Sequence, residues 1–185
     1  MFLTFETRAF FVTMSKTKLI KFIKTCEKEE LEEQLLDLYL RFKEVKEFYD
    51  FSFNPNEQKR VEEAKLKIAR EYFPEGKRKP KKRRSVAQKH IDHLKKLEVE
   101  ASQIIDLMLY NIEIAQAYNA EKPIAQEAFY KSMLSSFRKA LVAINQQFLK
   151  EEFLTRVEKI EQTAADQKWI NAEGFKRSIK DLLEN

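Results

Sequence analysis

The sequence predicts an all-α protein of about eight amphipathic helices, arranged as a bundle or as a stack of helical hairpins with one basic loop. Three observations support this fold class. The 185 residues include only two Gly and four Pro, too few for the many tight turns of an all-β chain. Apolar residues recur at three- and four-residue spacings, as in helices that bury one face. Charged residues make up 35% of the chain with both signs interspersed, as on long solvated helices.

The beginning of the chain is apolar and aromatic, but Glu6 and Arg8 interrupt it, so it does not form the apolar core of a signal peptide. Ser15 follows Met14 and is a good N-cap for a short helix with an apolar stripe. We therefore expect residues 1–13 to be a non-native extension without a structural role. The alternative is an apolar arm that packs on the domain. A single helical domain would cover residues 14–185.

The first long helix is expected over residues 28–48. Its apolar residues are spaced alternately by four and three, which makes a heptad seam of nearly three repeats. Because three heptads are short for a long coiled coil, we expect a helix pair within the chain. Leu38 and Phe42 lie in the middle of the seam and are expected to be core residues. The seam consists of Leu31, Leu35, Leu38, Phe42, Val45 and Tyr49.

A second helix is expected to follow a strong start signal and to end before Pro74. Asn54 can cap it, Pro55 fits its first turn, and Glu57 occupies the capping-box position. Its apolar residues recur at helical spacing and are expected to face the core. They are Val61, Ala64, Ile68 and Tyr72.

Residues 77–84 read KRKPKKRR and carry seven positive charges, so they account for the whole basic excess of a chain whose net charge is +5. A localised charge of this kind predicts a polyanionic partner, such as the phosphates of nucleic acid. The alternative is a solvated linker that docks on an acidic segment of the same chain, such as residues 27–33. The candidate anion-binding residues are Lys77, Arg78, Lys79, Lys81, Lys82, Arg83 and Arg84.

The basic run lies in the clearest break of the helical pattern. Pro and Gly residues interrupt any helix over residues 74–84, and like charges repel one another, so we expect an exposed and mobile loop. This loop would join two possible halves, residues 14–73 and 85–185.

The helix after the loop is expected to begin at a capping box formed by Ser85 and Gln88 and to continue to about Leu97. Short connections between the following helices favour antiparallel neighbours. The first of these helices is apolar over most of its circumference and is expected to be the central buried helix. The remaining helices are expected over residues 101–119, 123–147, 150–168 and 172–183. The last three carry apolar residues at helical spacing: Phe129, Met133, Phe137, Leu141, Ile144 and Phe148 in the first, Phe153, Val157, Ile160 and Ala164 in the second, and Phe175, Ile179 and Leu182 in the third.

Polar residues within the helices are interpreted as structural. Asp106 and Glu113 share one helix face, and no Glu-x-x-His unit accompanies them. We interpret them either as a narrow solvent-facing stripe or as ion pairs with neighbouring helices. Asn111 is expected to be a buried polar group bonded to another helix. His90 and His93 lack a third metal ligand and are expected to be packed or half-buried.

The motifs of common enzyme classes are missing from the sequence. It contains no P-loop, no G-x-G-x-x-G, no G-x-S-x-G and no H-E-x-x-H. We therefore expect no enzymatic activity, no metal site and no cofactor. Trp169 is expected to be a core residue. Cys26 is the single cysteine, and no stretch approaches the roughly 20 apolar residues of a membrane span, so a cytoplasmic location without membrane contact is expected.

Five long segments resemble an uncharacterised bacterial family of small all-helical proteins, a domain of unknown function. The resemblance covers residues 14–183 and implies a bacterial cytoplasmic protein, which disfavours a nuclear import signal at the basic run. It implies no activity, cofactor or catalytic residue. The segments are LIKFIK, EELEEQLLDLYLRFKEVKEFYDFSFNP, REYFP, KKRRSVAQKHI and DLMLYNIEIAQAY.

Two functional hypotheses follow from the sequence. The first is a non-catalytic binding protein that uses its basic loop to contact nucleic acid or another polyanion. The alternative is a protein–protein interaction or scaffold module with a helical groove. A positive surface that extends beyond the loop, through Lys89, Lys95 and Lys96, would favour the first, and an exposed apolar groove would favour the second. The oligomeric state is left open.

Overall fold

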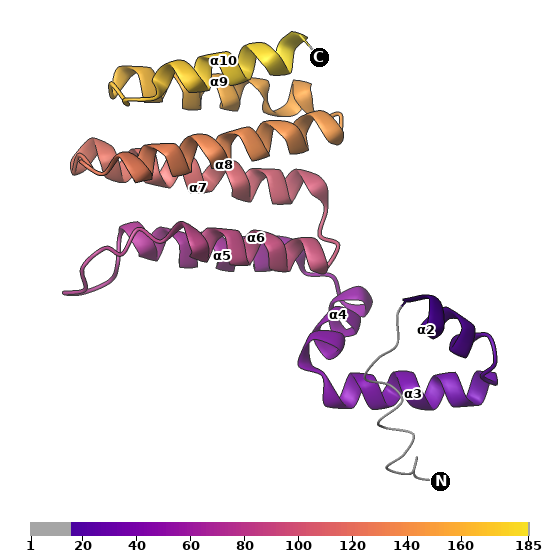
Figure 1. Ribbon diagram of the computed structural model, residues 1–185. Coiled ribbons are helices and arrows are strands. Elements are labelled where there is room, and N and C mark those ends of the chain that lie inside the picture. The colour runs from indigo at the N-terminus through magenta and orange to yellow at the C-terminus, as the bar shows by residue number, and fades with distance from the viewer. Residues whose placement is uncertain (1–15, 185) are drawn as a thin grey trace. The chain divides into compact units, whose positions relative to one another are not determined.

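The computed structural model describes residues 16–184, and within that range every regular element is an α-helix (Figure 1). The predicted all-α class is confirmed, with nine helices in the described part against about eight expected. The expected extension, residues 1–13, lies outside the described residues. The helices are α2 (Lys16–Ile23), α3 (Lys28–Arg41), α4 (Lys43–Phe53), α5 (Glu57–Tyr72), α6 (Arg84–Lys96), α7 (Ala101–Glu121), α8 (Glu127–Gln146), α9 (Lys150–Asp166) and α10 (Ala172–Glu184).

The chain divides into two units, Met1–Asn54 and Pro55–Asn185. The basic loop does not mark this division. It connects α5 to α6 within the second unit, and these two helices pack against each other. The division therefore falls about twenty residues before the expected one at residues 74–84.

In the first unit, the helix predicted over residues 28–48 is two helices, α3 and α4. They are separated at Phe42, whose backbone is extended with φ −111° and ψ 114°. The break lets α4 pack against α3, and Tyr39 Oη donates a hydrogen bond to Asp50 Oδ1 at 2.6 Å. No Gly or Pro marks this break, so the continuous helix predicted from periodicity is wrong for a tertiary reason.

The expected core of the first unit is also different. Leu38 is 43% exposed and Phe42 is 50% exposed, so the prediction that both are core residues is wrong. Phe51 is the one buried residue in the described part of this unit. Three short helices enclose little interior volume, because the ratio of surface to volume rises as a unit becomes smaller.

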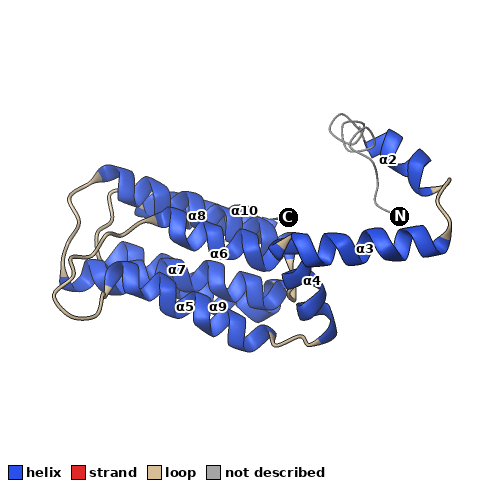
Figure 2. Cartoon of the chain, turned by 90° about the horizontal axis from the view of Figure 1, so that it is seen from below, coloured by secondary structure: helices blue, strands red, loops and turns tan. Residues whose placement is uncertain are grey.

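The second unit is a stack of three helical hairpins, formed by α5 and α6, α7 and α8, and α9 and α10 (Figure 1). Viewed from below, α5, α7 and α9 form one layer, and α6, α8 and α10 form the other (Figure 2). Of the two predicted arrangements, the hairpin stack is therefore the one observed in this unit.

The core of the stack is built around α7, which packs against α5, α6, α8 and α9. Its side chains Leu107, Leu109 and Ile112 are 0% exposed, which confirms the predicted central helix. The stripes predicted for the neighbouring helices are also buried, except that Phe129 is half-buried and Phe148 is 92% exposed. The confirmed core residues are Val61, Ala64, Ile68, Tyr72, Met133, Phe137, Leu141, Ile144, Phe153, Val157, Ile160, Ala164, Phe175, Ile179 and Leu182.

The predicted starts of three helices are shifted. The N-cap of α5 is Asn56 instead of Asn54, and α6 begins at Arg84, so Ser85 lies inside the helix instead of capping it. Helix α8 begins at Glu127, four residues after the predicted start at Pro123. A side chain of α7 holds the loop between α7 and α8, since the Ile124 amide donates a hydrogen bond to Asn119 Oδ1 at 3.0 Å.

Candidate polyanion-binding face

The basic loop is anchored at its C-terminal end by Glu71, which lies in the last turn of α5. The amides of Lys81 and Lys82 donate to the Glu71 carbonyl oxygen at 3.0 and 2.9 Å. The Arg83 guanidinium donates to the Glu71 carboxylate at 2.9 and 2.7 Å, and the Arg83 amide donates to it at 3.2 Å. This end of the loop, which the sequence predicts to be exposed and mobile, therefore makes several hydrogen bonds with one residue of α5. The acidic partner that the structure provides is Glu71.

The Arg83 contact also sets the electrostatics of the anchor. Its hydrogen bonds lower the pKa of the Glu71 carboxyl below its ordinary value, although partial burial opposes the shift. The Glu71 side chain is only 12% exposed. A nearly buried carboxylate thus stays ionised beside the loop and orients its last residues at the start of α6.

The seven candidate residues differ in exposure. Lys77, Arg78, Lys79, Lys81 and Arg83 are exposed, whereas Lys82 and Arg84 are half-buried. The loop turns at Gly76, which has φ +69°, a backbone conformation that glycine adopts without strain. Three of the exposed cations, residues 77–79, follow this turn directly.

The two half-buried cations contact the next hairpin. Lys82 Nζ lies 5.4 Å from the centroid of the Tyr118 ring, within cation–π range. Arg84 Nη1 donates to the Ser132 carbonyl oxygen of α8 at 3.5 Å. The loop is thereby tied to α7 and α8 as well as to α5.

A groove of about 760 Å³ lies between α6 and α8. Met108 of α7 contributes to its lining, and Asp92 of α6 is the one carboxylate along it. Four cations border the groove, and all four are exposed. They are Lys95, Lys131, Arg138 and Lys139.

The basic loop leads directly into this groove. Arg84 is the first residue of α6, and the α8 carbonyl that it reaches belongs to Ser132, the neighbour of Lys131. At about 1.5 Å per residue, the stretch of α6 from Arg84 to Lys95 is roughly 16 Å long. The positive charges therefore continue beyond the loop along a track of this order. Lys95, one of the residues expected to extend the positive surface, lies on it.

The two layers of the stack differ in charge. Helices α6, α8 and α10 together contain ten Lys and Arg residues and five Asp and Glu residues. Helices α5, α7 and α9 contain eight basic and twelve acidic residues. The groove thus belongs to the positive layer, and the positive charge of the loop continues that of its helices.

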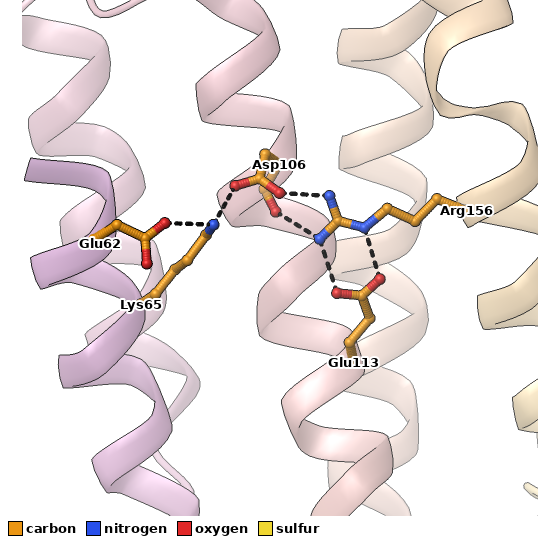
Figure 3. A network of polar contacts seen from close by, with 5 residues as sticks. All are labelled: Glu62, Lys65, Asp106, Glu113 and Arg156. Atoms are coloured by element: carbon orange, nitrogen blue, oxygen red, sulfur yellow. Dashed lines mark hydrogen bonds and ion pairs between the residues drawn. The ribbon is translucent and has the colours of Figure 1, made fainter. Parts of the chain in front are cut away.

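The opposite layer is held by a charged network centred on Arg156 of α9 (Figure 3). Its guanidinium donates to Asp106 Oδ1 at 2.5 Å and to both carboxylate oxygens of Glu113 at 2.7 and 2.8 Å. Lys65 of α5 bridges Asp106 and Glu62, at 2.8 Å from each. Of the two interpretations of Asp106 and Glu113, ion pairs with neighbouring helices are the one observed.

This network suits a structural role better than acid–base chemistry. Partial burial alone would raise the pKa of the Asp106 carboxyl, but hydrogen bonds from Lys65 and Arg156 lower it overall. The carboxylate is therefore ionised and already engaged, so it is a poor proton donor. Among the described residues, no group of three or more His, Cys, Asp or Glu side chains is placed to hold a metal ion.

The other polar residues singled out in the sequence are structural as well. His90 is half-buried, and burial, with Lys67 and His93 nearby, lowers the pKa of its imidazole. Asn111 is buried, as expected, and its Oδ1 accepts no hydrogen bond. Trp169 is 3% exposed and belongs to the core, as predicted.

Sequence reasoning missed the α8 side of the groove and the Glu71 anchor. Lys131, Arg138 and Lys139 are unremarkable in the sequence, because only the pairing of α6 with α8 in one layer brings them beside Lys95. A charge count for each helix would have indicated them, since α8 has three basic residues and one acidic residue.

The chain belongs to DUF6155, a family of unknown function, which it matches over residues 14–184. This confirms the resemblance to a domain of unknown function. No curated protein and no solved structure matches the chain. Within residues 16–184, none of the helices combines the length and the apolar character needed to cross a membrane.

Proposed function

We propose that this member of DUF6155 is a non-catalytic, cytoplasmic protein that binds nucleic acid through its phosphates. The binding face consists of the basic loop, residues 77–84, and the groove between α6 and α8. The observation that supports the proposal is continuity: Arg84 connects the loop to α8 beside Lys131, where the cationic groove begins.

The chemistry of this face favours phosphate over base recognition. Exposed Lys and Arg side chains neutralise phosphates, whereas base readout requires an element placed in a groove of the nucleic acid. A track of about 16 Å along α6 would face roughly five phosphates of one strand, spaced about 3.4 Å apart. Binding would therefore tolerate many sequences and weaken strongly with salt.

The test is fluorescence anisotropy with labelled single- and double-stranded DNA and RNA over a series of salt concentrations. If four to seven cations engage phosphates, log K against log salt should have a slope of about −3 to −6. A variant with Lys77, Arg78 and Lys79 changed to Ala should flatten the slope by about two to three units. A variant with Lys95→Ala and Lys139→Ala should flatten it by about one to two units.

Arg83 is left intact in this design, because its replacement would also remove the ion pair with Glu71. The matched control changes Lys59 and Lys159 to Ala, two exposed lysines on the acidic layer. The control should keep the slope of the natural protein. Absence of binding at low salt would refute the proposal. An equal flattening of the slope in the control and in the Lys95→Ala, Lys139→Ala variant would refute it as well.

A protein-interaction role is the second candidate, and a separate observation favours it. Exposed large apolar side chains are concentrated in the first unit, among them Leu36, Leu40 and Phe53. The two functions are compatible, since they use different units of the chain.

A further inference from the structure

We propose that α2, α3 and α4 form a homodimerisation arm, in which α2 of one copy covers the apolar surface of α3 in a second copy. The partner is another molecule of the same chain, and the contact occurs twice about a two-fold axis. This inference does not depend on the proposed binding of nucleic acid.

The first unit has a group of exposed large apolar residues, whereas such residues are usually scattered singly over a protein surface. Leu40 is 80% exposed, Phe53 is 76% exposed and Leu36 is 62% exposed. Nine large apolar residues are exposed in the described part of this unit. They are Leu19, Ile20, Ile23, Leu35, Leu36, Leu38, Leu40, Phe42 and Phe53.

This surface requires a cover. Phe51 is the one buried residue in the described part of the unit, so its three helices have almost no interior of their own. Among the described elements of this unit, α3 packs chiefly against α4, and α2 makes few contacts with it. Burial of the exposed Leu, Ile and Phe side chains by a partner would supply the hydrophobic stabilisation that the unit lacks.

Charge identifies the partner as a second copy. Residues 16–24, which contain α2, carry four Lys and no acidic residue, and they present Leu19, Ile20 and Ile23 as exposed apolar groups. Residues 27–33, which begin α3, carry five Glu and one Lys. One unit therefore contains a basic apolar helix and an acidic apolar helix. A two-fold axis between two copies would pair each with its complement.

The pattern of α3 supports helix-on-helix packing. Leu31, Leu35 and Leu38 follow the four–three spacing of a heptad seam. On the same helix, Leu36 and Leu40 are one turn apart and form a second, more exposed stripe. One stripe can face α4 while the other remains accessible to the α2 of the second copy.

The test exchanges charges between the two helices in the full chain. One variant carries Lys18→Glu and Lys21→Glu, and the other carries Glu29→Lys and Glu33→Lys. By sedimentation equilibrium, the natural protein should form dimers, and each variant alone should self-associate about tenfold or more weakly. An equimolar mixture of the two variants should form heterodimers as stable as the natural dimer, because opposite charges then face each other in both contacts.

Two further variants complete the design. Leu36→Glu with Leu40→Glu should abolish association, while the thermal transition of the second unit should remain. Lys59→Glu with Lys159→Glu, in the second unit, should leave association unchanged.

Three results would overturn the proposal. The first is a natural protein that stays monomeric at all accessible concentrations, which would mean that another segment, such as residues 1–13, or a different protein covers the arm. The second is a dimer that is insensitive to the charge reversals. The third is a mixture that associates no better than either variant alone.

Discussion

Arg156 shows how one side chain can connect three helices. Its guanidinium on α9 binds both Asp106 and Glu113 of α7, and Asp106 is also bound by Lys65 of α5. The Arg156 side chain is 27% exposed, so solvent screens these contacts only in part. Partly buried, bidentate ion pairs of this kind contribute more to the stability of the fold than ordinary surface ion pairs do.

Replacement of Arg156 by Met should destabilise the fold by about 1–3 kcal/mol. The partly buried Glu113 carboxylate loses its hydrogen bonds from Arg156, and Asp106 keeps only those from Lys65. Urea denaturation measures this change as a lower midpoint. Arg177→Met, on the exposed surface of α10, is the matched control and should shift the midpoint little. Equal midpoints for the two variants would show that the network contributes nothing beyond surface charge.

The same network predicts a dependence on pH. The pKa of the Asp106 carboxyl in the folded protein is lowered from its ordinary value of about 3.9. Its ionisation therefore stabilises the fold fully above that value, and this contribution is lost as the pH falls through the lower folded pKa.

An Asp106→Asn variant cannot titrate at this position, so its stability deficit relative to the natural protein should shrink as the pH falls below about 4. Urea midpoints between neutral and acidic pH measure the deficit. Glu158→Gln on α9 is the control and should show little deficit at any pH. A deficit for Asp106→Asn that stays constant down to the lowest pH would contradict the assignment.

At this scale the sequence predicted the roles of residues better than their partners. The seven-residue separation of Asp106 and Glu113 places them on one helix face, so their shared ion pair could be anticipated. Arg156 lies more than forty residues away, and only the packing of α9 against α7 identifies it. Glu71 was missed because local sequence does not reveal where a loop returns.

At the scale of the helix, α8 contains a buried aromatic residue and is followed by an exposed one. Phe137 lies in the middle of α8 with 0% exposure, next to Phe175 at a ring-centroid distance of 4.8 Å. Phe148 lies just beyond the end of α8, with φ 57° and 92% exposure. The sequence placed both on one apolar stripe, because spacing does not show where a helix ends.

Phe137→Ala should therefore destabilise the protein by about 3–5 kcal/mol, the range for a fully buried Phe. Phe148→Ala should change the stability by no more than about 0.5 kcal/mol. Phe42→Ala, at a position that the heptad seam predicts to be in the core, should also be mild because Phe42 is 50% exposed. The three urea midpoints test the order, and a Phe148 variant as unstable as the Phe137 variant would contradict it.

The helix boundaries show a similar limit. Pro74 correctly predicted the end of α5, since proline excludes the preceding residue from helical geometry. Phe42 gave no such signal, and the break there follows from the packing of α4 on α3. Capping signals at Asn54 and Ser85 were misleading because neighbouring residues, Asn56 and Arg83, take the N-cap positions.

For the molecule as a whole, stability should reside in the second unit. Apart from Phe51, the buried apolar residues in the described part of the chain all belong to Pro55–Asn185. A fragment of residues 55–185 should fold alone and melt within a few degrees of the full chain. Circular dichroism on heating tests this, and a fragment without a cooperative transition would show that the first unit completes the core.

The unequal charge of the two layers has a consequence for how the protein moves. The helices of one layer contain ten basic and five acidic residues, and those of the other contain eight basic and twelve acidic residues. The stack therefore has an electric dipole perpendicular to its layers. In the field of a polyanion, such a dipole would experience a torque that turns the positive layer toward the polyanion before contact. The net charge of +5 hides this directionality. The protein should bind both cation- and anion-exchange media at low salt, with the opposite layer facing each.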